Sequence, residues 1–494
     1  MAGIFVYVIS FVAMAMLAPL GVALRCGDVR SAIAFAIPSA LGIISGAIAT
    51  YSLRRRKAET LGIGSAFTAV GGSWVSACVF GATPFLISGA ITRVTDAIFE
   101  SISGFTTTGA TIFSEVENLP PAINLWRCET HWLGGMGVIV LVVALIPLLG
   151  IGGFRLVKAE TTGPEKGKFT ARIANTAKAL WLVYFAFTAL QASLLRLCGM
   201  GWFDAVCHAF STLGTGGFST RNGSVASFGL PGAEWVCTVF MLLASVNFAI
   251  YCRLLSGRRP SEILRDSELR AFLCIAGGAM LLAFLGHGTE GAGVATALRG
   301  SAFQVASILS TTGFMTEDYL LWRPFAQMVI FVLFLVGGCS GSTAGGIKVV
   351  RWTLLAKQLA NEVRRLLHPR AVYTVRLDGH PGREDLVPLA ATFIFAYVML
   401  VFVTALVGAM GGLAPFDALT GALSMVGNIG PAFGKLGPTS NYGFLPAPVK
   451  WWYCFAMLAG RLEIYTMAIL AARALRGAVI AILRHPQDNA TAQV

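Results

Sequence analysis

The chain has 494 residues, of which 56% are hydrophobic and only 12% are charged, and its formal net charge is +13. So apolar a composition is typical of a polytopic membrane protein and excludes a soluble multidomain protein. The ten cysteines lie mostly inside apolar runs without a Cys-x-x-Cys pair, and the six histidines are scattered. We therefore expect inert thiols and no metal site built from these side chains.

Ten apolar runs are long enough to cross a membrane, because a transmembrane helix needs about 20 apolar residues. In chain order they are 3–24, 32–52, 66–91, 126–149, 179–200, 234–255, 270–287, 325–347, 386–411 and 450–472. They predict an all-α polytopic membrane protein with about ten transmembrane helices.

The basic residues are distributed unevenly between these runs. The segments that hold 26 of the 37 Lys and Arg residues are 54–57, 155–178, 253–270, 348–383 and 473–484. If the spans alternate in direction, these segments all face one side, which the positive-inside rule assigns to the cytoplasm. Membrane topology therefore accounts for the positive charge, and we expect no nucleic acid as a partner.

A small-residue loop built on Thr or Ser and Gly occurs four times between the runs. The loops are SGFTTTGAT (103–111), STLGTGGFS (211–219), SILSTTGFMT (307–316) and MVGNIGPAF (425–433). Glycine permits positive φ angles, so consecutive carbonyl oxygens can turn toward one axis and hold a dehydrated cation. Four loops in one register predict a carbonyl-lined selectivity filter that faces the outside. The residues expected to bind the cation are Thr107, Thr108, Gly109, Thr215, Gly216, Gly217, Thr311, Thr312, Gly313, Asn428, Ile429 and Gly430.

A short apolar stretch precedes each loop and is too brief to cross a bilayer. Thirteen positions before the filter glycine it carries Asp96, Asp204, Gly300 or Asp417. This order predicts four repeats of membrane helix, pore helix, filter loop and membrane helix in a pseudo-fourfold arrangement, with the pore-helix dipoles pointing at the cavity. We expect the acids to cap the pore helices rather than to touch the ion, and the third helix to be capped by Ser301 or in another way.

The run 325–347 contains a cluster of glycines near its cytoplasmic end. They are Gly337, Gly338, Gly341, Gly345 and Gly346. Each costs a helix about 1 kcal/mol relative to Ala, so the helix is expected to break here. Close helix packing is the alternative, but only one of the four copies carries the cluster. We therefore predict a mobile loop that obstructs the cavity below the filter and takes part in gating.

Arg461 lies near the middle of the last span, 11 residues after Lys450 and 12 before Arg473. A charge so far from either end costs about 3 kcal/mol, so a functional role in gating is the default expectation. An ion pair that holds two helices together is the alternative. Glu463 faces another side of the helix and is expected to be structural. The basic segment 348–385 is either a lever for a soluble partner or a solvated linker.

These features resemble the Trk/Ktr/HKT superfamily of potassium transporters, and its TrkH branch in particular. Besides the filters and the two extra N-terminal spans, the resemblance is carried by HWLGGMGVIVLVVALIPLLGIGG (131–153), GGCSGSTAGGIKVVR (337–351) and GRLEIYTM (460–467). It implies a pore within one subunit, a homodimer and a cytosolic nucleotide-binding regulatory subunit of the TrkA type. Glycine in all four filters goes with potassium selectivity in this superfamily, although the fourth loop, with fewer hydroxyl groups, predicts a looser carbonyl geometry. The resemblance also places Arg461 in the pore beneath the filter.

The repeats divide the chain into five parts. They are two N-terminal helices in 1–60, repeat 1 with a cytoplasmic linker in 61–178, repeat 2 in 179–268, repeat 3 with the Gly-rich loop and basic segment in 269–385, and repeat 4 with the C-terminal tail in 386–494.

The function favoured by these observations is potassium uptake across the cytoplasmic (inner) membrane of a bacterium through a gated pore, with potassium as the transported ion and no organic cofactor. The alternative is a symporter that couples potassium to protons or sodium. It needs titratable groups near the pore, for which only Arg461, Glu463 and Glu100 qualify loosely. An enzyme is not expected, because His131 and Cys128 have no third partner that would complete a catalytic group.

Overall fold

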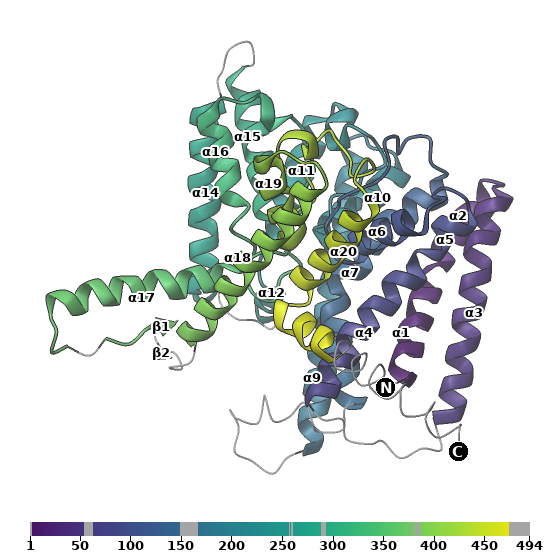
Figure 1. Cartoon of the computed structure of the whole chain (residues 1–494), viewed down its shortest axis with the longest axis horizontal. Helices are drawn as coiled ribbons and strands as arrows, with labels where there is room; N and C mark the ends of the chain where they lie inside the picture. Colours follow the sequence, from purple (N-terminus) through teal and green to yellow (C-terminus); the bar gives the residue numbers. More distant parts are fainter. Residues whose placement is uncertain are drawn as a thin grey trace, which may run out of the picture.

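The computed structural model describes residues 2–53, 63–148, 166–255, 257, 260–287, 293–371, 373–377, 380–381 and 386–473. Within these ranges the chain is nearly all helical, as predicted (Figure 1). The only strands there, β1 (Arg376–Leu377) and β2 (His380–Pro381), form one short antiparallel pair. The basic cluster 54–57 and the segment after Arg473 lie outside the described residues.

The N-terminal part consists of α1 (Ala2–Ala15), α2 (Leu17–Arg25) and α3 (Val29–Leu53). Helix α3 crosses α1 at two glycines four residues apart, Gly42 and Gly46, where a side chain would collide with Ala13 and Ser10 of α1. Ser10 Oγ donates a hydrogen bond of 2.8 Å to Gly42 O. Small residues at this spacing let two membrane helices approach closely, and α1 also contacts the next helix, α4.

The remaining helices form four repeats of the predicted order. The first comprises α4 (Ile63–Gly81), α5 (Thr83–Ile87), α6 (Val94–Phe105) and α7 (Pro121–Leu148). The second comprises α9 (Lys166–Leu197), α10 (Trp202–Gly214), η1 (Ser224–Phe228), α11 (Pro231–Ala244), α12 (Phe248–Leu255) and α13 (Pro260–Ile263). The third comprises α14 (Ser267–His287), α15 (Val294–Leu309), η2 (Tyr319–Leu321), α16 (Pro324–Leu333) and α17 (Val349–Leu367). The fourth comprises α18 (Leu386–Met410), α19 (Pro415–Gly427), η3 (Gly434–Leu436), α20 (Ala447–Arg461) and a further helix, Ile464–Arg473.

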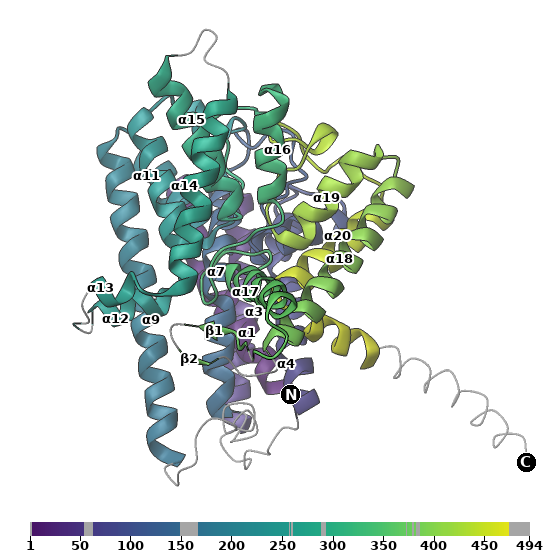
Figure 2. The same cartoon turned by 90° about the vertical axis from the view of Figure 1, so that its left-hand side faces the viewer.

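The pore helices are α6, α10, α15 and α19. They have 12, 13, 16 and 13 residues, respectively. At about 1.5 Å per residue even the longest is shorter than the hydrocarbon core of a bilayer, which is about 30 Å thick. Most of their residues after the first turn are buried, so these short helices lie inside the protein. In the view of Figure 2, two of them, α15 and α19, are seen on either side of α16.

The four repeats close into a ring, because the second helix of each repeat packs against the pore helix of the next. Helix α7 contacts α10, α11 contacts α15, and α20 contacts α6. The remaining junction is aromatic, with ring centroids 5.7 Å apart between Phe331 of α16 and Phe416 of α19. This closed order is the expected pseudo-fourfold arrangement.

Six helices of the described part are long and apolar enough to span a membrane, and the bent pair α11 and α12 makes a seventh span. No more than half of the most apolar window of each of the six is buried inside the protein. Their exposed faces carry large apolar side chains such as Leu182, Leu282 and Phe402, which fits contact with lipid. The protein is a multi-pass membrane protein.

Three of the predicted spans, 234–255, 325–347 and 450–472, are interrupted helices. Only the break in 325–347 was predicted. In the second repeat α11 and α12 meet at an angle of 91°, and Asn247 Oδ1 accepts the Ala249 amide at the start of α12 (2.9 Å). In the fourth repeat α20 ends at Arg461 and Glu463 adopts a φ of 59°. Hydropathy does not reveal such breaks, because the runs remain apolar through them.

Candidate ion pathway

The four filter loops share one backbone conformation. The first residue of each is left-handed, with φ of 54–57°, and the glycine two positions later has φ of 80–99°. These residues are Thr107, Thr215, Thr311 and Asn428, and Gly109, Gly217, Gly313 and Gly430. Left-handed threonine is rare because its branched side chain crowds the backbone, and such strain costs about 1–3 kcal/mol and clusters at functional sites.

A serine six positions before each filter glycine anchors the loop to its pore helix. Its carbonyl accepts a hydrogen bond of 2.8–3.0 Å from the amide five residues later. The four serines are Ser103, Ser211, Ser307 and Ser424. This bond ends a helix on a left-handed residue and redirects the carbonyls that follow. The serines were missed in the sequence, although they share the register of the glycines.

The glycines bring the four loops together in a closed ring. A Cβ atom on any of them would collide with a backbone carbonyl oxygen of the next loop. The contacts are Gly109 with Gly216 O, Gly217 with Thr312 O, Gly313 with Ile429 O, and Gly430 with Thr108 O. The last junction is the widest, with 2.6 Å between the ideal Cβ position on Gly430 and the oxygen of Thr108. Only glycine fits at these four positions.

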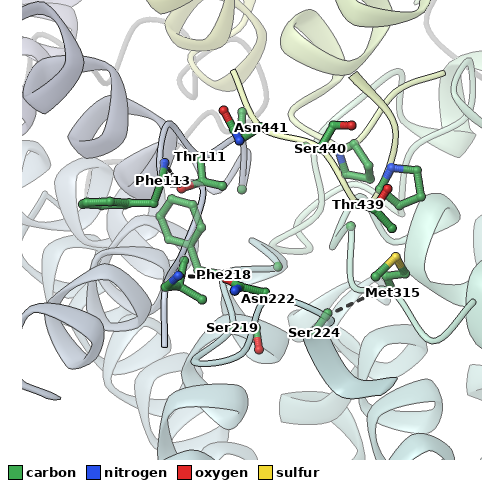
Figure 3. Close-up of a pocket in the computed structure, with 18 of the residues that line it drawn as sticks. Thr111, Phe113, Phe218, Ser219, Asn222, Ser224, Met315, Thr439, Ser440 and Asn441 are labelled. Atoms are coloured by element: carbon green, nitrogen blue, oxygen red, sulfur yellow. Dashed lines mark hydrogen bonds between the residues drawn. The ribbon is translucent and has the colours of Figure 1, made fainter. Parts of the chain in front are cut away.

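A cavity of about 110 Å³ opens above the ring and forms its vestibule. Its wall comes from the segments that follow the filters in all four repeats, as Figure 3 shows with Phe113, Phe218, Met315, Ser440 and others. None of the described lining residues is acidic, whereas two are arginines. Carbonyl and hydroxyl oxygens and the carbonyl ends of the pore helices therefore attract a cation here, without a ring of carboxylates.

The three pore-helix acids do not cap their helices, so that prediction was wrong. Asp96, Asp204 and Asp417 are each the third residue of a helix whose preceding residue is extended and makes no side-chain cap. The helix starts are set instead by the extended backbone before them and, in α19, by a proline at the first position. The acids still place negative charge near the positive end of each helix.

These acids hold segments outside their own helices. The bonds are Asp204 Oδ1 with Thr220 Oγ1 (2.5 Å), Asp417 Oδ2 with the Lys435 amide (3.2 Å) and Asp96 Oδ1 with Lys450 Nζ (2.7 Å). Two of the partners follow the filter of the same repeat, and the third belongs to α20.

The third pore helix starts one turn earlier than its counterparts. Helix α15 follows Gly293, so Gly300 is its seventh residue. Ser301 does not cap it, and its Oγ is buried without a hydrogen-bond partner in the described part of the chain. In that part of the chain, the cap by Ser301 that the sequence suggested for α15 is therefore absent as well.

A polar side chain fixes the wall of the vestibule in the first three repeats. It lies four positions after Asp96, Asp204 or Gly300. In the first repeat Glu100 is fully buried, pairs with Arg127 (Oε1–Nε 2.8 Å) and accepts the Ile112 amide (2.9 Å). Glu100 is thus neutralised within the wall instead of facing the pore. The corresponding bonds in the next two repeats are His208 Nε2 with Ser219 Oγ (2.9 Å) and Gln304 Nε2 with Glu317 O (2.7 Å).

Below the ring, on the side of α17 (Figure 1), residues 334–348 leave the helical conformation where the glycine cluster predicted a break. The Gly345 amide donates a hydrogen bond of 2.7 Å to Thr311 Oγ1 of the third filter. A Cβ atom on Gly345 would collide with Gly427 O at the end of α19. Thr343 Oγ1 donates to Ala244 O at the end of α11 (3.0 Å). The loop therefore lies directly beneath the filter.

Arg461 turns toward the same loop. Its Nη1 donates to Thr343 O (2.6 Å), and its Nη2 donates to Gly134 O (2.9 Å) and Gly135 O (3.3 Å) of α7. Thr343 O also accepts a hydrogen bond from Thr215 Oγ1 of the second filter (2.9 Å). All four repeats therefore meet at this guanidinium group and the carbonyl that it binds.

Two further contacts hold the loop and were missed in the sequence. Glu268 Oε1, at the start of α14, accepts the amides of Ser340 (2.7 Å) and Val350 (3.1 Å). Arg351 of α17 pairs with Glu463 (Nη2–Oε2 2.7 Å), which gives Glu463 the structural role that we expected. No local spacing reveals these partners, which are 72 to 112 residues apart.

Four pore helices around a ring of carbonyls, with a loop and an arginine beneath, define a cation-conducting membrane protein whose pseudo-fourfold pore lies within one chain. The chain belongs to the TrkH family of cation transport proteins, whose family model matches residues 32–479. Members of this family are transporters, and the protein is not an enzyme.

Curated relatives and a solved structure agree with this assignment. The chain is 39% identical to the Trk system potassium uptake protein TrkH of Halomonas elongata, over 87% of this chain and 90% of that protein. It is 37% identical to the protein of the same name from Escherichia coli K12, over 80% and 83%. The crystal structure of the potassium transporter TrkH from Vibrio parahaemolyticus superimposes with a TM-score of 0.82 at 36% identity, over 95% of this chain and 98% of that chain.

Proposed function

We propose that the protein takes up potassium across the cytoplasmic (inner) membrane of a bacterium through a gated pore. The observation that carries this proposal is the closed ring in which each filter glycine packs against a carbonyl of the next loop. Backbone carbonyls can replace the hydration shell of a potassium ion without any acidic side chain. The names of the relatives support potassium as the transported ion. Such a pore needs no organic cofactor.

The potassium ions are held by the filter residues 107–109, 215–217, 311–313 and 428–430. Two side-chain oxygens of the innermost filter positions, Thr107 Oγ1 and Asn428 Oδ1, are buried and have no hydrogen-bond partner in the described residues. Buried polar atoms are normally paired, so these oxygens support a site for a hydrated cation just below the filter.

The gate consists of the Gly-rich loop and Arg461. The loop blocks the path below the filter, and its glycines at 337, 338, 341, 345 and 346 allow it to change conformation. The guanidinium charge repels a cation strongly where little water screens it. Opening requires Thr343 O to release both Arg461 and Thr215.

Coupled symport is less favoured, because its candidate proton carriers are occupied. Glu100 pairs with Arg127, and Glu463 pairs with Arg351. Reversal potentials measured under separate potassium and proton gradients distinguish the two mechanisms. We expect reversal to follow the potassium equilibrium potential alone.

We further propose that two copies form a homodimer and that a cytosolic nucleotide-binding subunit of the TrkA type acts on α17. Figure 1 shows this helix projecting sideways from the body, and it begins directly after the Gly-rich loop. A partner that moves α17 would therefore pull on the loop. We retain the five-part division of the chain as the frame for these roles.

Growth of an uptake-deficient strain at low potassium tests the proposed function, with rubidium and sodium as competitors. Gly217→Ser and Gly313→Ser are expected to abolish rescue or to lose the preference for potassium, since each side chain would enter the carbonyl ring. Gly412→Ser is the matched control, because Gly412 also has a positive φ (89°) but no atom within 4 Å of its Cβ position. Normal rescue by both filter variants would show that these loops are not the filter.

A further inference from the structure

The third repeat differs from the others at the position of the pore-helix acid. Gly300 stands where the other repeats carry Asp96, Asp204 and Asp417. The helix dipole favours a negative charge in the first turn of a helix. Because α15 begins one turn earlier than the other pore helices, residue 300 lies beyond that first turn. The third repeat therefore lacks the carboxylate that the others aim at neighbouring segments.

A carboxylate from another segment occupies this place. A Cβ atom on Gly300 would collide with the side chain of Glu317, with 2.6 Å to Cδ and 2.8 Å to Oε2. Glu317 lies on the segment that follows the third filter, four residues after Gly313. In the third repeat the glycine on the pore helix leaves room, and the segment after the filter provides the carboxylate.

The fourth repeat shows the reverse arrangement at the same two positions. Asp417 is on the pore helix, and Gly434 stands four residues after the filter glycine, as Glu317 does in the third repeat. A Cβ atom on Gly434 would collide with the Asp417 carboxylate, 2.6 Å from Oδ2. The third and fourth repeats thus each pair one carboxylate with one glycine across the same contact, with the two residues exchanged.

Glu317 connects three helices of its repeat. Its carboxylate binds His287 Nε2 at the end of α14 (2.6 Å) and Trp322 Nε1 just before α16 (3.2 Å). Its backbone oxygen accepts a hydrogen bond from Gln304 of the pore helix α15 (2.7 Å). The segment after the third filter is therefore held at Glu317 between the pore helix and both membrane helices.

We propose that Glu317 is the positioning residue of the third filter, and that its carboxylate, which lies over Gly300 of α15, fixes the segment after the filter by binding His287 and Trp322. The Asp417 carboxylate has the corresponding role in the fourth repeat, where it accepts the Lys435 amide. The role of Glu317 rests on the proposed function, since the segment continues directly from the carbonyls of residues 311–313. Moving the segment moves those carbonyls relative to the ring, and the preference for potassium over sodium depends on that geometry.

The test exchanges the two residues and measures the ratio of potassium to sodium uptake in cells with matched amounts of protein in the membrane. Glu317→Gly is expected to lower the ratio about tenfold, the change that corresponds to a lost charged hydrogen bond. Gly300→Asp alone forces two carboxylates into one place and is expected to lower it further. The double variant Gly300→Asp/Glu317→Gly copies the fourth repeat and is expected to recover most of the loss. An unchanged ratio for Glu317→Gly, or a double variant no better than Gly300→Asp, overturns the proposal.

Two further variants make the outcome decisive. If Glu317→Gly does not reach the membrane, Glu317→Gln keeps the shape of the side chain, and a ratio equal to that of the unmodified protein overturns the proposal. Glu115→Gln removes the same charge from an exposed site after the first filter and is expected to leave the ratio unchanged. Gly313→Ser in the same assay distinguishes a failure of the role proposed for Glu317 from a failure of the filter assignment. If it loses the preference while Glu317→Gly keeps it, only the role of Glu317 fails, and if it keeps the preference, the filter assignment itself fails.

Discussion

The filter ring and the layer beneath it are built in opposite ways. In the ring all four loops repeat the same φ angles, the same serine anchor and the same glycine contact. In the described part of the layer beneath, the third repeat supplies a loop and the fourth supplies an arginine that binds it. A selective site needs equivalent oxygens around its axis, whereas a gate needs one part that moves without deforming the others. A single chain with four diverged repeats satisfies both requirements.

The second helices of the repeats show where the symmetry ends. Helix α7 continues unbroken to Leu148, whereas the corresponding helices of the other three repeats are interrupted. Among these described interruptions, the one in the third repeat lengthens into a loop, residues 334–348. This loop contacts the filter of its own repeat, the filter of the second repeat and the pore helix of the fourth. Divergence therefore begins directly below the ring.

The ring itself is expected to be the most sensitive part. Gly217→Ala places a methyl group against Thr312 O and is expected to abolish potassium uptake, whereas Gly430→Ala, at the widest junction, is expected to retain part of it. Rubidium uptake at low external concentration measures both. Gly412→Ala serves as the control for backbone strain alone. Equal activity of the Gly217 and Gly430 variants would contradict a ring closed by carbonyl contacts.

Arg461→Ala is expected to increase flux through the open pore, since it removes a positive charge and three hydrogen bonds from the layer beneath the filter. Charged hydrogen bonds contribute about 1.5–3 kcal/mol each, so the closed arrangement should lose much of its stability. Single-channel or flux measurements on purified protein in vesicles provide the test. Arg473→Ala, an exposed residue that donates to Thr68, is the matched control. Unchanged flux would leave Arg461 a structural role only.

The parts that could be predicted from the sequence are those that depend on local residue types. Filter loops need glycine at fixed positions, and a helix breaks where five glycines gather, so both were visible as patterns. The helix starts were not, because Pro415 and extended residues, not the acids, determine where the pore helices begin.

Contacts between residues far apart in the chain could not be predicted from the sequence either. Asp96 binds Lys450, which is 354 residues away. Glu268 lies in the first turn of α14, where the helix dipole favours any acid, so its sequence position does not reveal that it binds the loop. Such pairs depend on how the repeats pack, and no periodicity of a single segment records that packing.

Glu268→Gln is expected to loosen the Gly-rich loop by a smaller amount than Arg461→Ala. The glutamine keeps one carbonyl oxygen for the two amides of the loop but loses the charge that strengthens both bonds. Hydrogen exchange at residues 340–350 is expected to accelerate, and open probability is expected to rise. Asp266→Asn, which changes an acid that accepts the amides of Glu268 and Leu269 at the start of α14, is the control. Unaltered exchange in the loop would show that Glu268 does not hold it.

The pair of Arg351 and Glu463 is expected to have the smallest effect, although it joins α17 to the break in the last span. The Glu463 side chain is 51% exposed, and exposed ion pairs contribute about 0.2–1 kcal/mol. Arg351 keeps a second contact, since its guanidinium carbon lies 3.6 Å from the ring centroid of Phe393. A double-mutant cycle with Arg351→Ala and Glu463→Ala should therefore give a coupling in open probability of at most about fivefold, the change that 1 kcal/mol produces.

The exposed pair of Arg365 and Glu362, which lies within α17, is the matched control for this cycle. Both of its residues belong to one helix, so its coupling in open probability is expected to be zero. A coupling for the control equal to that of Arg351 and Glu463 would mean that charge on α17, rather than its attachment to the fourth repeat, controls the gate. A coupling confined to Arg351 and Glu463 instead supports a path from α17 to the asymmetric layer, with the filter ring unchanged above it.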